Sequence, residues 1–200
     1  MACRTESKAQ DAIKDIQSAA PDSKGKLGFL QLDLSDLKTI QPAAEAFKAK
    51  ESKLHVLFNN AGVMVPPPDK KTAQGYDMQL GTNCLGPVLF TNLLTDTLKA
   101  TAQQEPKGTV RVVWVSSSAA EIYSTKNGLN MDEVRNKDTY GKGGAPMDLY
   151  GNSKAGNYLH SVEYARRHKD DGIVSVVSLS SPRTSSNMTD IYPGIESRQS

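Results

Sequence analysis

The residues of this sequence that could perform chemistry include a tyrosine and a lysine four positions apart. Tyr150 and Lys154 lie in the segment DLYGNSKAGNYLH, which has the pattern of the start of a helix. Positions i and i+4 share one face of a helix. A free tyrosine titrates near pKa ~10, and a neighbouring ammonium lowers that pKa because it favours the phenolate. Lys154 could therefore tune Tyr150 as a proton donor or acceptor, although a solvated lysine beside a half-buried tyrosine is the alternative.

Two clusters of small polar residues could join this pair. Ser117 is the second serine of VSSS at 115–118, which follows the strand pattern TVRVVWV at 109–115. A serine hydroxyl can donate to a substrate oxygen as negative charge develops there. The segment NNAG at 59–62 follows another short strand and would let a second molecule approach the backbone closely. A flexible loop or a helix cap for VSSS and an ordinary turn for NNAG are the alternatives.

The elements that must position these residues alternate along the chain. Strands followed by helices, with near-continuous apolar character in each strand, predict an α/β fold with a parallel sheet covered on both faces. The expected N-caps are Thr5 and Ser35, and Gly86-Pro87 is expected to kink or break the third helix. Helices are predicted at 5–20, 35–50, 72–102 and 149–167, with strands or apolar runs at 26–34, 54–58, 109–115 and 172–179.

A ligand site in such a sheet lies at the carboxyl ends of the strands. Polar residues follow each apolar segment at this edge: Asp33, the NNAG segment, Ser116 to Ser118, and Ser180 onward. The sequence therefore predicts one site to which four connections contribute.

Composition sets the broad class of the protein. The 200 residues, 38% hydrophobic and 23% charged, predict a single globular domain over 1–200, with a long surface insertion at 118–148 and an irregular tail at 181–200. The net charge of +2 comes without any Lys or Arg run longer than two, which argues against nucleic-acid binding.

Other classes of site and location are disfavoured as well. No apolar run approaches the ~20 residues of a membrane span, and the first ten residues lack a signal-peptide core, so a cytoplasmic protein is expected. Cys3, Cys84 and the histidines do not have metal-ligand spacing, so no metal site is expected.

Together the motifs resemble the short-chain dehydrogenase/reductase superfamily, closest to its retinol-dehydrogenase-like and fungal reductase branch. The resemblance extends over about residues 1–180 and implies a Rossmann-like, doubly wound parallel sheet. It is carried by D-L-S-D at 33–36, N-N-A-G at 59–62, Asn83, V-S-S-S at 115–118 and Y-G-N-S-K at 150–154, in this order.

The resemblance implies reversible hydride transfer between a nicotinamide and the carbonyl or alcohol carbon of a small-molecule substrate. Tyr150 would be the general acid/base, and Lys154 would lower the pKa of Tyr150 and hold the nicotinamide ribose. Ser117 would orient the substrate oxygen, and Asn83 would hold a water of the proton relay. Family members commonly form dimers or tetramers, so a homo-oligomer is possible.

The resemblance also implies which residues hold the cofactor. Arg4 matches a basic position that pairs with a 2′-phosphate, which favours NADP over NAD. Asp33 and Asn60 match positions on the adenine and ribose side. The full expected set is Arg4, Asp33, Asn59, Asn60, Ala61, Gly62, Tyr150 and Lys154.

Two parts of the family pattern are missing from this sequence. Members of the family begin with a strand and a Gly-rich turn, but no G-x-x-x-G-x-G or G-x-G-x-x-G occurs here. In the family's sheet order, 3-2-1-4-5-6-7, this first strand lies between the second and the fourth. The two neighbouring strands are therefore expected to lose a partner, at about 1–3 kcal/mol for each buried unpaired backbone group. The final strand and the helices that cover the substrate are missing too, so an open or incomplete substrate pocket is expected.

Other functions remain open. One is a truncated, non-catalytic family member that acts as an interaction partner and lacks the cofactor phosphate site. A serine hydrolase is disfavoured, since Gly151-Asn152-Ser153-Lys154-Ala155 only loosely matches G-x-S-x-G and no adequate strand precedes it. Neither the substrate nor the reaction direction can be derived from these residues.

Overall fold

The computed structural model describes residues 1–126 and 128–180, which form alternating strands and helices. The expected α/β order is confirmed, and the strand–helix alternation of the sequence is its cause. The strands are β1 (Ala2–Cys3), β2 (Leu30–Gln31), β3 (Val56–Asn59), β4 (Arg111–Ser117) and β5 (Val174–Ser180). The helices are α1 (Glu6–Ala19), α2 (Leu37–Lys50), α3 (Met78–Leu80), the π-helical η1 (Gly81–Leu85), α4 (Gly86–Ala102), α5 (Ala119–Tyr123), α6 (Met131–Arg135) and α7 (Pro146–Arg167).

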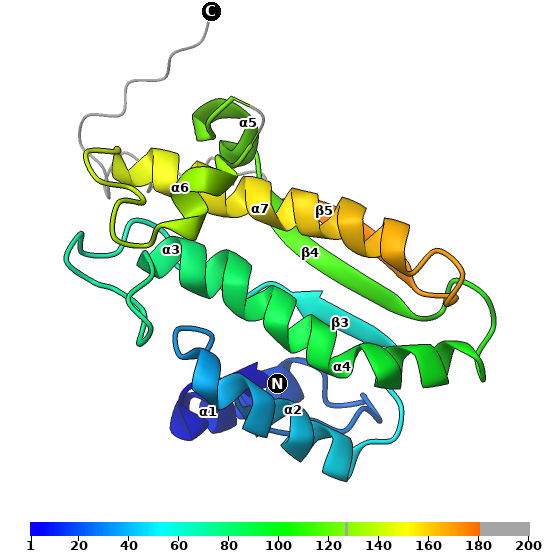
Figure 1. The fold of residues 1–200 in the computed structure, drawn as a ribbon. Coiled ribbons are helices and arrows are strands. Elements are labelled where there is room, and N and C mark those ends of the chain that lie inside the picture. The colour runs from blue at the N-terminus through cyan, green and yellow to red at the C-terminus, as the bar shows by residue number, and fades with distance from the viewer. Residues whose placement is uncertain (127, 181–200) are drawn as a thin grey trace, which may run out of the picture.

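The strands form two separate parallel sheets. β1 pairs with β2, and β3, β4 and β5 pair in that order (Figure 1). The register of β3 aligns Val56 with Arg111 and Asn59 with Trp114. The sheets separate between β1 and β3, where the family's strand order places the strand that this sequence lacks. Among the residues that the structure describes, each sheet therefore ends at that point in an edge strand without a neighbour, as expected from the sequence.

Helices α2 and α4 pack against each other and connect the two sheets. Ile40 and Ala44 of α2 are fully buried and lie in one apolar cluster with Phe90 and Leu94 of α4. Leu32, directly after β2, belongs to the same cluster. This packing holds β1 and β2 beside the larger sheet, although no backbone hydrogen bonds join the two sheets in the described residues.

The larger sheet is covered on one face by α4 and α7 (Figure 1). Val112 and Trp114 point to that face and are fully buried, and Leu98 of α4 packs on them. The opposite face of the sheet carries Val56, Phe58, Val174 and Val176, each more than a third exposed. Successive side chains of a strand alternate between faces, so these residues point away from the helices. In the described residues no helix covers this apolar face.

The helix N-termini differ from the expected caps. Thr5 precedes α1 as predicted but makes no side-chain cap hydrogen bond. The cap of α2 is Asp36, whose carboxylate accepts from the Lys38 N–H, and not Ser35. The Ser35 hydroxyl instead donates to Asp33, so it is not available for the helix.

The predicted long helix at 72–102 begins later than expected. Residues 72–77 form a turn, and Asp77 caps α3 by accepting from the Gln79 and Leu80 N–H groups. Gly86-Pro87 does not break the helix. The turn before it widens into η1, where the Gly86 N–H donates to the Gly81 carbonyl five residues back. The backbone thus stays helical to Ala102, and the missing Pro87 N–H is accommodated at the start of α4.

The described residues of the segment at 118–148 include the short helices α5 and α6, and Ala119 and the large side chain of Tyr140 are buried. Gly151 at the start of α7 packs so closely on α5 that a Cβ there would lie 2.7 Å from the Ala119 carbonyl oxygen. The segment is therefore anchored to α7. The irregular tail expected at 181–200 lies outside the described residues.

Candidate active site

Helix α7 presents Tyr150 and Lys154 toward the carboxyl end of β4. The helix begins at Pro146, earlier than the predicted residue 149, because proline suits a first helical turn that needs no N–H donor. The Lys154 ammonium lies 5.8 Å from the centroid of the Tyr150 ring. The predicted i, i+4 pair therefore shares one face, and Lys154 is only 5% exposed.

The Lys154 ammonium is bound to the backbone of β4. Its Nζ donates to the Val115 carbonyl at 2.9 Å, and burial lowers the pKa of Lys154 because it disfavours the charged form. A solvated lysine, the alternative considered for this position, is therefore excluded.

Burial also shifts Tyr150, in the direction opposite to the expected one. Burial raises the pKa of Tyr150, and a hydrogen bond with the Ser117 side chain opposes this rise. Lys154 was expected to lower the pKa of Tyr150, but in this structure its ammonium is directed to the Val115 carbonyl. The phenol is therefore protonated near neutral pH.

Ser117, at the end of β4, is brought to Tyr150 as predicted. Its side chain is buried, and its hydroxyl oxygen accepts a hydrogen bond from the Ala119 N–H at 3.2 Å. The hydroxyl can thus donate its proton elsewhere while its oxygen is held by the first turn of α5. The alternative of a flexible loop for VSSS is excluded, since residues 115–117 lie in β4.

Asn83, in the π-helical η1, connects the loop after β3 to α7. Its Oδ1 accepts from the Val63 N–H at 2.7 Å, and its Nδ2 donates to the Val63 carbonyl and to Ser153 Oγ. Ser153 in turn donates to the Tyr150 carbonyl. The fully buried Asn83 amide therefore fixes the loop relative to the Tyr150 turn of the helix.

The NNAG segment contributes its backbone through Gly62. A Cβ at Gly62 would lie 2.9 Å from Asn83 Oδ1 and 3.7 Å from Lys154 Nζ, so a larger residue would press on both groups. Asn59 has a different place, since its Nδ2 donates to Thr91 of α4 and its side chain is buried. Asn60 is exposed.

A small cavity of about 130 Å³ lies where the two sheets separate. Four of the expected cofactor residues line it: Arg4, Asp33, Ala61 and Gly62. Asn59 and Asn60 do not line it. Asp33 is held by Ser35, whose N–H and hydroxyl both donate to its Oδ1. The cavity thus combines a cation, a carboxylate and the closely approached backbone of the NNAG segment.

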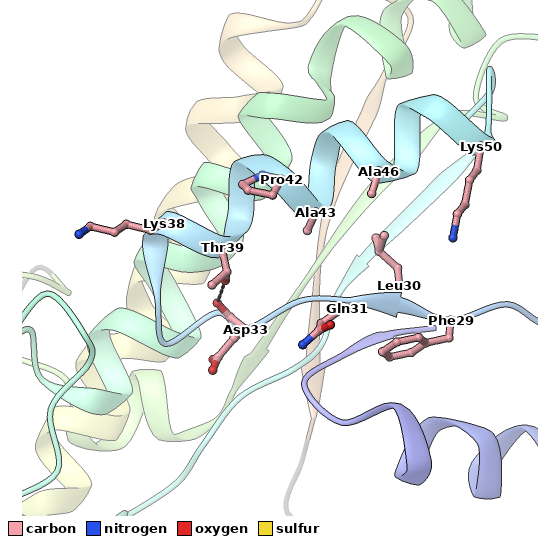
Figure 2. Close-up of a pocket in the computed structure, with 10 residues that line it drawn as sticks. All are labelled: Phe29, Leu30, Gln31, Asp33, Lys38, Thr39, Pro42, Ala43, Ala46 and Lys50. Atoms are coloured by element: carbon pink, nitrogen blue, oxygen red, sulfur yellow. Dashed lines mark hydrogen bonds between the residues drawn. The ribbon is translucent and has the colours of Figure 1, made fainter.

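A larger trough lies between β2 and α2 and was not predicted. It has a volume of about 540 Å³, and Asp33 lines it as well as the small cavity. Figure 2 shows apolar walls from Leu30, Ala43 and Ala46, with the Thr39 hydroxyl donating to the Asp33 carbonyl. Its formation depends on how α2 lies across β2, which no motif in the sequence indicates.

Two further buried amides were missed by sequence reasoning. Gln79 accepts from the Val65 N–H and donates to the Pro146 carbonyl, so it ties the loop after β3 to the start of α7. Asn157 donates to the Val115 carbonyl, the same acceptor that Lys154 uses. Asn157 lies three positions after Lys154, and this spacing was the available signal.

Neither a metal-ligand cluster nor a membrane-spanning helix is present among the described residues. Within residues 1–126 and 128–180, no group of three or more His, Cys, Asp or Glu side chains is arranged to hold a metal. A helix with the length and apolar character of a membrane span is not found in the described part of the chain.

Comparison with known proteins identifies close relatives in fungi. The chain is 49% identical over 178 residues to a short-chain dehydrogenase/reductase of Phomopsis amygdali, covering 88% of this chain and 52% of that protein. It is 50% identical over 181 residues to the short-chain dehydrogenase/reductase pkfC of Emericella nidulans, with 88% and 55% coverage. The chain thus spans about half the length of these relatives.

Solved structures support the fold. A protein from Mycobacterium paratuberculosis superposes with a TM-score of 0.66 at 28% identity, over 95% of this chain and 61% of that one. The NADPH-bound carbonyl reductase from chicken fatty liver gives a TM-score of 0.59 at 21% identity, with 88% and 65% coverage.

The model of the short chain dehydrogenase family matches residues 1–128. This match covers more than half of the sequence, and it agrees with the two fungal relatives and with the Rossmann-like arrangement of the strands. The chain therefore belongs to the short-chain dehydrogenase/reductase family.

Proposed function

We propose that this chain carries the proton-transfer side of an NADP-dependent oxidoreductase site. The reaction is reversible interconversion of a carbonyl and an alcohol on a small organic or secondary-metabolite substrate. The observation that supports it is that Ser117 of β4 and Lys154 of α7 both lie beside Tyr150. Asn83 of η1 is linked to the same turn of α7 through Ser153. A neighbouring serine, tyrosine and lysine supply, in that order, a hydrogen-bond donor, a proton carrier and a cation.

The residues present fit part of a nicotinamide dinucleotide. Gly62 lines the small cavity with its backbone alone, because Asn83 Oδ1 takes the space that a Cβ would need, so a ligand in the cavity can approach this backbone closely. Arg4 and Asp33 line the small cavity, and a guanidinium suits a 2′-phosphate, which supports NADP over NAD. Tyr150 and Lys154 would hold the nicotinamide ribose, and Arg4, Asp33 and Ala61 the adenosine side.

The chain's residues divide the chemistry among them. The nicotinamide, when bound, supplies or accepts the hydride at the substrate carbon. Tyr150 gives or takes the proton at the substrate oxygen, and its raised pKa keeps the phenol protonated near neutral pH. The Ser117 hydroxyl donates to the same oxygen as negative charge develops. Lys154 lowers the pKa of Tyr150 once its ammonium leaves the Val115 carbonyl. Asn83 acts through position, because its buried amide holds the Val63 loop against the Tyr150 turn of α7.

The proposal is tested with NADPH, NADH and a panel of small ketones and aldehydes. We expect the folded chain to bind NADPH with micromolar affinity, as measured by nucleotide fluorescence. Tyr150→Phe should keep this affinity while turnover falls about 10²- to 10⁴-fold, since the general acid is removed. Tyr158→Phe, on the exposed side of the same helix, is the control and should behave as wild type. Wild-type turnover in Tyr150→Phe would show that Tyr150 is not the acid.

The second candidate is a non-catalytic family member that acts through an interaction surface. The uncovered apolar face of the larger sheet, with Phe58 and Val176 exposed, favours this candidate. A demonstrably folded sample that binds neither NADPH nor NADH at millimolar concentration would support it and would contradict the oxidoreductase proposal for this chain.

A further inference from the structure

The carbonyl of Val115 accepts two hydrogen bonds from helix α7. Lys154 Nζ donates at 2.9 Å and Asn157 Nδ2 donates at 3.0 Å. A carbonyl oxygen has two lone pairs, so it can accept from both donors. Lys154 is 5% exposed and Asn157 is 2% exposed, so water has little access to this point of β4.

The shared acceptor determines what happens when Lys154 moves. A buried carbonyl that loses its only donor pays a desolvation penalty, which would hold the ammonium in place. With Asn157 still bound to Val115, the ammonium can leave without stranding the carbonyl. A Cβ at Gly62 would lie 3.7 Å from Lys154 Nζ, and the centroid of the Tyr150 ring lies 5.8 Å from it, so a polar ligand between these two residues would meet the ammonium.

We propose that Asn157 is a positioning residue for Lys154: its amide keeps the Val115 carbonyl paired, so that the Lys154 ammonium can turn to a polar ligand beside Gly62 and Tyr150. The identity of that ligand as the ribose of NADPH rests on the proposed function. The positioning itself does not, because both hydrogen bonds are formed within this chain.

The rest of the Asn157 amide is poorly suited to a purely stabilising role. Its Oδ1 is buried and accepts no hydrogen bond from another described residue. An amide with only one end satisfied is costlier to bury than an apolar side chain of similar shape. The useful contact of this side chain is therefore the donation to Val115.

The groups that face Lys154 are few, so a change in its titration can be assigned. Tyr150 faces it from α7 and is the titratable neighbour among the described contacts. Asn83 of η1, the Gly62 backbone and the Val115 carbonyl of β4 are uncharged. A shift caused by a substitution at Asn157 thus reports on the shared carbonyl or on Tyr150.

The test measures the pKa of Lys154 by NMR titration of the full chain labelled with ¹³C-lysine. Lys154→Met identifies the signal. In Asn157→Leu the Lys154 ammonium becomes the sole side-chain donor to the Val115 carbonyl. The acid dissociation constant of Lys154 should therefore fall about threefold to tenfold, which is measured as a higher pKa of Lys154. Ser161→Ala, one turn further along the sheet-facing side of α7, is the control and should leave this pKa unchanged.

The same variants are then titrated with NADPH. Asn157→Leu should bind it several-fold more weakly than wild type and Ser161→Ala, because leaving Val115 now strands the carbonyl. If Asn157→Leu does not fold, Asn157→Ala, which cannot overpack the site, replaces it. A folded Asn157 variant with the wild-type pKa of Lys154 would overturn the positioning role. Failure of every variant to bind NADPH would instead count against the proposed function, while the lysine titration still decides the role of Asn157.

Discussion

At the scale of single residues, burial acts on Tyr150 and Lys154 in opposite directions. It raises the pKa of the phenol and lowers that of the ammonium, since both groups favour their neutral forms away from water. The Ser117 hydrogen bond opposes the rise at Tyr150. A protonated phenol beside a hydroxyl donor is suited to delivering a proton to a carbonyl oxygen, and movement of the ammonium toward it would favour the reverse step.

His160 predicts a pH dependence of stability. It lies against Cys84 Sγ at 3.2 Å and near the Trp114 ring, and burial lowers the pKa of His160 from 6.5 to about 4. The unfolded chain therefore takes up a proton that the folded chain refuses. Stability is fully present above pH 6.5 and is lost as the pH falls toward 4, by about 2 kcal/mol between pH 7 and 5.

This prediction is checked by urea unfolding of wild type and His160→Gln from pH 7 to 5. The variant should lose stability at pH 7 but show a flatter pH dependence, because glutamine does not titrate. Carboxylates such as Glu163 titrate at lower pH and affect both proteins alike. Equal slopes in the two proteins would mean that His160 is not the titrating group.

Gly151 predicts a packing effect next to Tyr150. A Cβ there would lie 2.7 Å from the Ala119 carbonyl oxygen and 2.8 Å from the Ser124 nitrogen, both backbone atoms that cannot rotate away. Alanine gains about 1 kcal/mol in helix propensity, but overpacking costs about 1–3 kcal/mol. We therefore expect Gly151→Ala to be less stable by about 1 kcal/mol in thermal or urea unfolding.

Gly28 is the control that separates the packing effect at Gly151 from the general effect of replacing a glycine by alanine. Gly28 has nothing within 4 Å of its Cβ position, so Gly28→Ala should be neutral or slightly stabilising. If Gly151→Ala also proved neutral, α5 would have to be free to move away from α7.

At the scale of elements, the sequence predicts the order of helices and strands well and their starts poorly. Apolar spacing identified α2 through its end at Lys50, and α7 through its end at Arg167. The starts depend on which side chain captures the free N–H groups. Asp36 replaced Ser35 because Ser35 is bound to Asp33, a contact made by the fold of the loop.

The candidate site divides in the same way. Tyr150, Lys154 and Ser117 could be predicted, because the ends of parallel strands and the start of the next helix meet at one edge. Asn59 could not be separated from its neighbours in the NNAG segment by sequence, since its contact with Thr91 depends on where α4 lies. Gln79 and Asn157 were missed for the same reason, because their partners belong to other elements.

The helix caps provide a direct comparison. Asp77 is buried and accepts from two N–H groups of α3, whereas Thr5 precedes α1 without a cap hydrogen bond. Asp77→Ala should therefore cost about 1–2 kcal/mol in the free energy of unfolding. Thr5→Ala should cost less than about 0.5 kcal/mol. Urea unfolding measures both, and a Thr5→Ala cost as large as that of Asp77→Ala would mean that Thr5 caps α1 after all.

At the scale of the whole molecule, no strand pairing joins the two sheets within the described residues, and side-chain packing holds them together. Ile40 and Ala44 of α2 pack against Phe90 and Leu94 of α4, while β1 and β3 remain unpaired toward each other. Figure 1 shows α4 and α7 on one face of the larger sheet, and the opposite face carries exposed apolar side chains in the described part of the chain. Apolar faces and free strand edges of this kind promote association, so they govern solubility more than they govern folding.

Phe58 tests this view, because it is 65% exposed on that face at the unpaired edge strand. Phe58→Ser should change the free energy of unfolding by less than about 0.5 kcal/mol, as expected for a surface position. It should also reduce light scattering on concentration and lower the binding of a hydrophobic dye. Leu98→Ala, fully buried against the covered face, is the contrast and should cost about 2–5 kcal/mol. A large stability loss in Phe58→Ser would show instead that this face is covered in solution.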